Sequence, residues 1–276
     1  MISKRMVIAF VTLALVVIVI IILKINSSRN FEEKIQILFS SIENVPENIF
    51  SYAQLEQLPQ PVQTYFKYAI PANQPYIRCV RLKHVVQFKT APNKPWKDII
   101  GEQYFITTTP GFIWKGKIGP VAAQDMYITD KGKLMVSLFD TFTIMKSEGE
   151  KVDQGELLRW LGESVWFPTN LLPGDQLKWE SINDTSAKLI YDHQGILIYF
   201  IVSFNNKGEI IQLQTERYYN GQNLVTWIGN CSEYKKMNGI MIPTVISATW
   251  KLDTGDHNYA NFKLTEIAYD IPEKYK

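Results

Sequence analysis

Hydrophobic side chains fill the N-terminal part of the chain almost without interruption. Residues 6–23 (MVIAFVTLALVVIVIIIL) contain one polar side chain, Thr12. A helix of these 18 residues spans roughly 27 Å, close to the thickness of the hydrocarbon core of a bilayer. Neither a small-residue cleavage motif nor a cysteine that would accept a lipid follows the run. Residues 1–30 are therefore predicted to be an uncleaved signal anchor with a transmembrane segment at 6–23, the alternative being a cleaved signal peptide.

Basic residues flank this run on both sides. Lys4 and Arg5 precede it, and Lys24 and Arg29 follow it. Positive-inside counting, with the α-amino group included, places the N-terminus in the cytoplasm by a small margin. No second apolar run of this length occurs later in the chain. We therefore expect a single-pass protein of the cell membrane whose C-terminal domain is extracytoplasmic.

Helical periodicity continues after the anchor. Residues 31–42 place Ile35, Leu38, Phe39 and Ile42 on one helical stripe, and Ser28 is a candidate cap. Two further short helices are expected at 52–58 and 62–69, the second with Pro61 at its first position. Together these segments predict a helical neck over residues 31–75, packed on the domain beside the membrane.

From residue 76 the period of the hydrophobic pattern changes to two, which is typical of strands with one wet face. Later in the chain, Asn220-Gly221 and Asn238-Gly239 separate long β-rich segments, as in hairpins with type I′ turns. Because no glycine-punctuated βαβ alternation is present, a parallel sheet is not expected. Residues 76–276 are predicted to be a mainly β (α+β) domain. We expect a strongly curved, half-barrel-like antiparallel sheet of about a dozen strands.

One helix is expected to interrupt these strands, at residues 153–165. Leu157, Leu158, Leu161 and Val165 share one side of it. A curved sheet needs a cover for its concave face, and this inserted helix is the candidate.

Charge and cysteine content exclude several classes of protein. The chain has 29 basic and 27 acidic side chains, and four of the basic ones lie in residues 1–30, which contain no acidic ones. The rest is therefore close to neutral, which argues against a nucleic-acid partner. Only two cysteines are present, Cys79 and Cys231, so neither a disulfide-dense scaffold nor a cysteine-based zinc module is expected. We interpret them as two buried thiols, with a single disulfide as the alternative.

Familiar catalytic motifs are missing, and no metal site, cofactor or catalytic residue is predicted. Among the three histidines, only His84 shares its strand face with apolar neighbours. It is interpreted as a hydrogen-bonded core histidine or, alternatively, as a base or ligand contact at a cavity. Trp114 either fills the core or lines an apolar cavity.

The most site-like cluster lies on the inserted helix. Glu156, Arg159 and Glu163 share the face opposite the leucines, with Trp160 and Trp166 beside them. Two carboxylates around a guanidinium are compatible with acid–base chemistry, but ion pairs on a solvated helix face have the same spacing. We favour the salt-bridged outer or interface face, and the candidate ligand-binding residues are His84, Trp114, Glu156, Arg159, Trp160, Glu163 and Trp166.

Three stretches of the sequence resemble an uncharacterised bacterial domain-of-unknown-function family whose members are often membrane-anchored. They are Leu58–Phe66, the motif Pro110-Gly111-Phe112-Ile113-Trp114, and a segment from Gly155 that ends in Trp166-Phe167-Pro168-Thr169. This resemblance covers most of residues 55–270 and implies no activity. In strand count and meander order the chain is also similar, more loosely, to the half-barrel fold of periplasmic lipoprotein carriers, which implies an apolar groove for acyl chains.

Three functions remain open. The first is a membrane-tethered binding module that holds a lipid or other apolar ligand in a groove of the sheet. The second is a non-enzymatic interaction or accessory protein of the bacterial cell envelope, with a filled core and a protein partner. The third is an envelope enzyme that uses Glu156 or Glu163 with His84. Cavity volume separates the first two, and contact between His84 and a carboxylate tests the third.

Overall fold

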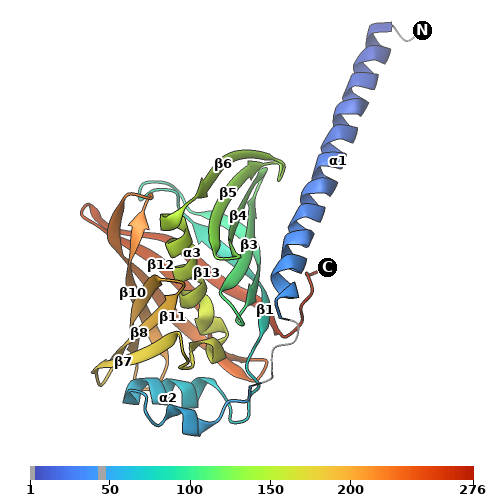
Figure 1. The fold of residues 1–276 in the computed structure, drawn as a ribbon. Coiled ribbons are helices and arrows are strands. Elements are labelled where there is room, and N and C mark those ends of the chain that lie inside the picture. Colours follow the sequence, from blue (N-terminus) through green and yellow to red (C-terminus); the bar gives the residue numbers. More distant parts are fainter. Residues whose placement is uncertain (1–3, 43–47) are drawn as a thin grey trace.

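The computed structural model describes residues 4–42 and 48–276, and a single antiparallel sheet organises most of them (Figure 1). Its 13 strands lie in the order β6-β5-β4-β3-β2-β1-β13-β12-β11-β10-β9-β8-β7. The first six are β1 (Cys79–Phe88), β2 (Lys97–Ile106), β3 (Gly111–Ile118), β4 (Val121–Ile128), β5 (Lys131–Leu138) and β6 (Phe142–Glu148). The others are β7 (Leu177–Asn183), β8 (Ser186–His193), β9 (Ile196–Phe204), β10 (Ile210–Tyr219), β11 (Asn223–Met237), β12 (Ile240–Leu252) and β13 (Gly255–Tyr269). Two meanders, β1–β6 and β7–β13, therefore join through the β1–β13 pair.

The hairpin turns follow the chemistry predicted from the sequence. Asn220 and Gly221 have φ of 49° and 67°, and Asn238 and Gly239 have φ of 48° and 88°. Positive φ at both central positions is what a type I′ turn requires, and Asn-Gly adopts it at low cost. The predicted mainly β, antiparallel architecture of about a dozen strands is confirmed.

The expected curvature needs correction, because the sheet is not strongly curled. Helix α3 (Glu150–Glu163) lies between its two halves and contacts β3 to β6 on one side and β9 and β10 on the other (Figure 1). Large side chains of the helix, among them Trp160, occupy the space between the halves. A sheet that has to accommodate a helix with such side chains stays wide and open, with β6 and β7 as its edges.

Helix α3 corresponds to the helix expected at 153–165. It begins three residues earlier, after Gly149, whose φ of 114° favours glycine. Two short 3₁₀ helices follow, η2 (Ser164–Trp166) and η3 (Pro168–Leu171). Leu157 and Leu161 are fully buried on one side, and Glu156 is only 9% exposed on the other. The face with Glu156, Arg159 and Glu163, favoured as a salt-bridged outer or interface face, is therefore enclosed within the fold and is not an outer face.

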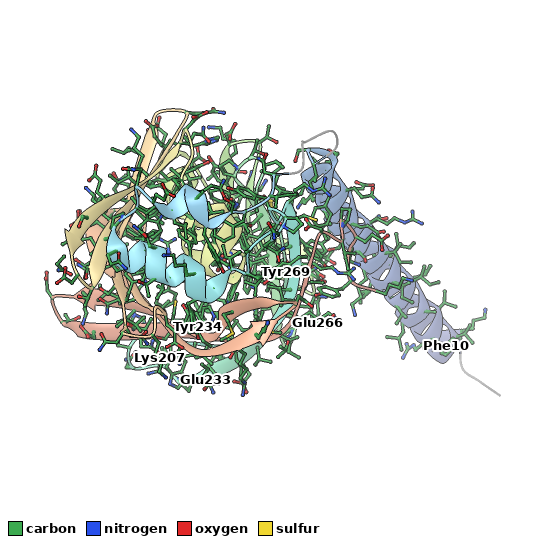
Figure 2. All side chains as sticks on the ribbon, turned by 90° about the horizontal axis from the view of Figure 1, so that it is seen from below. Phe10, Lys207, Glu233, Tyr234, Glu266 and Tyr269 are labelled. Carbon is green, nitrogen blue, oxygen red and sulfur yellow. The ribbon has the colours of Figure 1, made fainter. Side chains whose placement is uncertain are left out.

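Helix α1 (Lys4–Ser40) runs without a break through the boundary expected at residue 30. Phe31, Ile35, Leu38 and Phe39 pack on the outer face of β1–β4, as the predicted stripe requires. The earlier part projects away from the domain, with Phe10 73% exposed near its end (Figure 2). Within the described residues, α1 is the one helix long and apolar enough to cross a membrane.

The remaining helices close the other end of the molecule. They are η1 (Tyr52–Leu55) and α2 (Gln60–Ala69), and α2 has Pro61 in its first turn as expected. Val62, Tyr65 and Phe66 are fully buried in the main core. Figure 1 shows α2 at the end opposite to the start of α1, so α1 and α2 do not form one continuous neck. The division at residues 30 and 75 stays a prediction.

Both cysteines are buried free thiols, which confirms the favoured interpretation. Burial raises the pKa of Cys79 and that of Cys231 to about 12. Cys79 lies under α1, whereas Cys231 belongs to the main core between the sheet, α2 and α3.

Candidate functional site

A cavity of about 560 Å³ lies between α3 and the sheet. Its wall is mainly apolar and includes Trp114, Phe200, Trp227 and Phe262. The volume falls in the range that accommodates small-molecule ligands in proteins. Five of the seven expected site residues line it: Trp114, Glu156, Arg159, Glu163 and Trp166.

Arg159 organises the charged part of the cavity wall. Its Nη1 donates to Asp125 Oδ2 at 2.5 Å, and its Nε donates to Glu163 Oε1 at 2.9 Å. Gln103 donates from Nε2 to the other Glu163 oxygen at 2.6 Å. The guanidinium also lies 5.1 Å from the centre of the Trp114 ring, within the range of cation–π attraction. Each charge of this set has a direct partner, as buried charges require.

Glu156 differs from the other two carboxylates because no hydrogen bond or ion pair with a described residue holds its side chain. Burial and the neighbouring Asp125 raise the pKa of Glu156 to about 8, despite the opposing effect of Arg159. Burial also raises the pKa of Asp125 and of Glu163, but both pair directly with Arg159. Among these three carboxyl groups, Glu156 is therefore the one that retains its proton, and it is a neutral carboxylic acid near pH 7.

Three polar atoms of this wall have no hydrogen-bond partner from the described protein. They are Asp125 Oδ1, Glu156 Oε2 and Arg159 Nη2, and all three are buried. Orphaned buried polar atoms are uncommon and require a partner such as water or a ligand. Here a guanidinium N–H donor, a carboxylate acceptor and a carboxylic acid occur together on one wall of the cavity.

His84 lies next to the cavity rather than in its wall. The indole N–H of Trp114 donates to His84 Nε2 at 3.0 Å, and the two rings are stacked. Burial, together with the nearby Arg159 charge, lowers the pKa of His84 to about 3. Gly101 on β2 provides space for this pair, because a Cβ atom there would collide with both rings. His84 is thus a neutral histidine that positions Trp114.

The two tryptophans of the helical segment have different surroundings. Trp160 donates from Nε1 to the carbonyl oxygen of Ile106 at 2.9 Å and does not line the cavity. Trp166 donates to the carbonyl oxygen of Pro243 at 3.0 Å, and it does line the cavity. Both are at least 98% buried, so they fix α3 and η2 to the sheet.

Sequence reasoning missed three polar members of the site, namely Gln103, Asp125 and Arg217. Asp125 shares one face of β4 with Ala123 and Tyr127, and this position beside apolar residues was the only available signal that its carboxylate is enclosed. Arg217 on β10 adds a second positive charge near Glu156 and donates from Nη2 to the carbonyl oxygen of Gly155 at 2.9 Å. The opposite face of β4 is also covered, by α1, so the strand lacks the polar and apolar alternation that would mark Asp125 as unusual.

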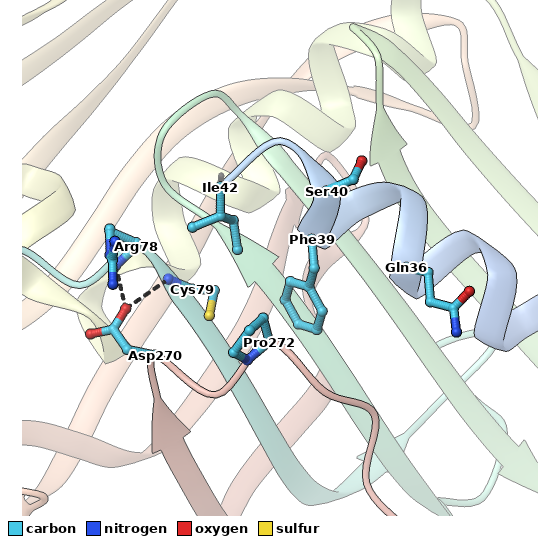
Figure 3. A pocket seen from close by; sticks show the side chains of 8 residues that line it. All are labelled: Gln36, Phe39, Ser40, Ile42, Arg78, Cys79, Asp270 and Pro272. Atoms are coloured by element: carbon cyan, nitrogen blue, oxygen red, sulfur yellow. Dashed lines mark hydrogen bonds between the residues drawn. The ribbon is translucent and has the colours of Figure 1, made fainter. Parts of the chain in front are cut away.

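A second cavity of about 400 Å³ lies between the end of α1, the start of β1 and the C-terminal segment (Figure 3). Its carboxylate, Asp270, accepts hydrogen bonds from the backbone N–H groups of Arg78 and Cys79 through Oδ1. This arrangement ties the end of β13 to the start of β1. None of the expected site residues lines this cavity, and we treat it as a structural junction.

Comparison with solved structures finds distant likenesses. A LolA superfamily protein from Nitrosomonas europaea aligns with a TM-score of 0.45 and 12% identity, over 75% of this chain and 90% of that chain. A DUF1329 family protein from Desulfovibrio piger aligns with a TM-score of 0.34 and 12% identity, over 77% of this chain and 94% of that chain. No curated protein matches the sequence. The model of a family of unknown function, DUF6544, matches residues 48–262, so the resemblance to an uncharacterised family is confirmed and the chain belongs to DUF6544.

Proposed function

We propose that this protein is a membrane-tethered binding module for an amphipathic ligand such as a lipid. The apolar part of the ligand occupies the cavity between α3 and the sheet, and its polar group sits against Asp125, Glu156 and Arg159. The observation that carries the proposal is the combination of a largely apolar cavity of about 560 Å³ with three unpartnered buried polar atoms in its wall.

The charges of the wall indicate the kind of polar group. With Glu156 protonated, the positive charges of Arg159 and Arg217 balance the negative charges of Asp125 and Glu163. A fully charged group would disturb this balance among buried charges. An uncharged group that both donates and accepts hydrogen bonds, such as a hydroxyl or an amide, fits Arg159 Nη2 and Asp125 Oδ1 at once.

The N-terminal helix supplies the tether in this proposal. Its apolar part crosses the cell membrane, with the N-terminus in the cytoplasm and the β domain on the extracytoplasmic side. The length and apolar character of α1 support the anchor, and the basic flanks support the orientation. An accessory protein without a ligand would have a filled core, which the cavity argues against.

An enzyme that uses His84 with Glu156 or Glu163 has less support. The contact that His84 makes through Nε2 is with Trp114, and its low pKa keeps it neutral. A general base that operates near pH 7 has a pKa close to that value, and the pKa of His84 lies far below it.

The test is native mass spectrometry of the full chain and of a variant with a filled cavity. Ala248 lines the cavity and is buried, so Ala248→Phe places a ring in the ligand volume. Both proteins carry the same α1, and lipids bound to the anchor are therefore common to both. A ligand present at one-to-one stoichiometry in the wild type and lost from Ala248→Phe supports the proposal. The same bound masses in both proteins would refute it, provided that both melt cooperatively.

A further inference from the structure

The hairpin formed by β5 and β6 has an exposed apolar tip. Phe139 is 53% exposed, Phe142 55%, Ile144 62% and Met145 46%. Isolated exposed apolar residues are ordinary, but four within seven residues at the edge of a sheet make this hairpin a candidate interaction surface. β6 is also an edge strand of the sheet, so no further strand of the described residues covers it.

This tip lies beside the apolar part of α1. Phe139, Thr141 and Phe142 form a groove together with side chains of α1, namely Thr12, Leu15, Val19, Ile20 and Leu23. Figure 1 shows the β5–β6 end of the sheet turned toward this helix. The α1 residues belong to the run that the sequence predicts to be transmembrane. The medium that surrounds this run therefore reaches the hairpin tip as well.

The same hairpin also borders the cavity. Val136 on β5 and Met145 on β6 line it, and these two residues are paired across the hairpin. Met145 lines the cavity and is also nearly half exposed, so this part of the cavity wall lies at the surface of the domain. One short hairpin thus borders both the cavity and the apolar part of α1.

We propose that residues 139–145 insert into the boundary between headgroups and acyl chains of the bilayer that α1 crosses, and that the cavity opens toward this boundary at Met145. The inference rests on the tethered binding module proposed above and adds the route by which its ligand enters. Within this geometry the ligand passes between the bilayer and the cavity along the β5–β6 hairpin.

The depth of insertion is limited by polar groups near the tip. Asp140 pairs with Lys115 at 2.5 Å and with Lys117 at 3.1 Å. Of the two lysines, Lys117 is exposed and can meet the phosphates of the headgroups, whereas Lys115 is buried. The free backbone edge of β6 also prevents deeper insertion, since unpaired N–H and C=O groups are costly in hydrocarbon. The hairpin therefore rests at the interface of the bilayer.

The experiment uses the full chain in nanodiscs of phosphatidylcholine and phosphatidylglycerol. A polarity-sensitive nitrobenzoxadiazole label is attached at Phe142→Cys or Ile144→Cys, while the native Cys79 and Cys231 are buried and free. The matched control is Lys207→Cys, in the β9–β10 turn beside α2, where Gly208 contacts Thr64 (Figure 2). Lipids brominated on the acyl chain quench only labels that touch them.

We expect blue-shifted emission and severalfold stronger quenching for labels at 142 and 144 than for the label at 207. Water-like emission without quenching at 142 and 144 would overturn the proposal. Blue-shifted emission without bromine quenching would overturn it too, because the tip would then be covered by protein. Neither result affects the mass comparison with Ala248→Phe, so failure of the hairpin proposal is distinguishable from failure of the binding function.

Discussion

Replacement of Glu156 by glutamine tests the assignment of the proton in the cavity wall. The pKa of this carboxyl rises from 4.5 to about 8 on folding, because burial and Asp125 disfavour its charge. A tenfold change in the dissociation constant of an acid corresponds to about 1.4 kcal/mol. At pH 7 the unfolded chain carries an ionised Glu156 and the folded protein a neutral one. Taking up this proton costs roughly 3 kcal/mol of stability at pH 7 and about 5 kcal/mol above pH 8.

Folding raises the pKa of Glu156, and this direction determines whether the stability of the wild type rises or falls with pH. The folded state binds this proton more tightly than the unfolded state. The free energy of unfolding of the wild type therefore falls as the pH rises from 4.5 to about 8. Glutamine has nearly the shape of the protonated side chain and does not titrate. We expect Glu156→Gln to match the wild type near pH 4.5 and to exceed it by roughly 3 kcal/mol at pH 7.

Urea unfolding of the full chain in detergent micelles, followed by tryptophan fluorescence, measures this difference at each pH. The matched control is Glu180→Gln, which makes the same substitution at an exposed position on β7, outside the cavity. A constant difference between wild type and Glu156→Gln across the window would refute the reasoning. It would mean that Glu156 is ionised in the folded protein and that the cavity wall carries a net negative charge.

Other predictions concern the surroundings of the site. Trp160→Ala and Trp166→Ala each remove a fully buried ring and should cost about 3–5 kcal/mol, measured by thermal unfolding, whereas an unchanged melting temperature would show that the ring does not pack as described. Gly101→Ala should cost about 1–3 kcal/mol of stability, because the added Cβ displaces the paired rings of His84 and Trp114. The indole N–H resonance of Trp114 should move in the NMR spectrum, and an unchanged spectrum would contradict this pairing. Cys79 and Cys231 should react with Ellman's reagent only after unfolding, since both are buried with raised pKa, and rapid reaction in the folded state would count against their burial.

Much of the fold could be predicted because strands and turns are encoded locally. The period of two over β1 and the Asn-Gly pairs at the hairpins placed strands and turns within a few residues. The expectation that a separate helix starts after the candidate cap Ser28 was wrong, because a residue that can cap a helix does not by itself interrupt one. No glycine or proline interrupts residues 24–40, so the hydrogen-bond ladder of α1 continues through Ser28.

The character of the site could be predicted only in part because it depends on which faces the fold covers. The spacing of Arg159 and Glu163 is the same on a solvated helix and on an enclosed one. The partner that decides between these environments, Asp125, lies 34 residues earlier on β4 and becomes visible only when strand and helix are packed. Once Arg159 is shared by Asp125 and Glu163, Glu156 has no counterion of its own and retains its proton. The unpartnered polar atoms on which the proposed binding site depends thus arise from tertiary packing around α3, for which the spacing within the helix provides no signal.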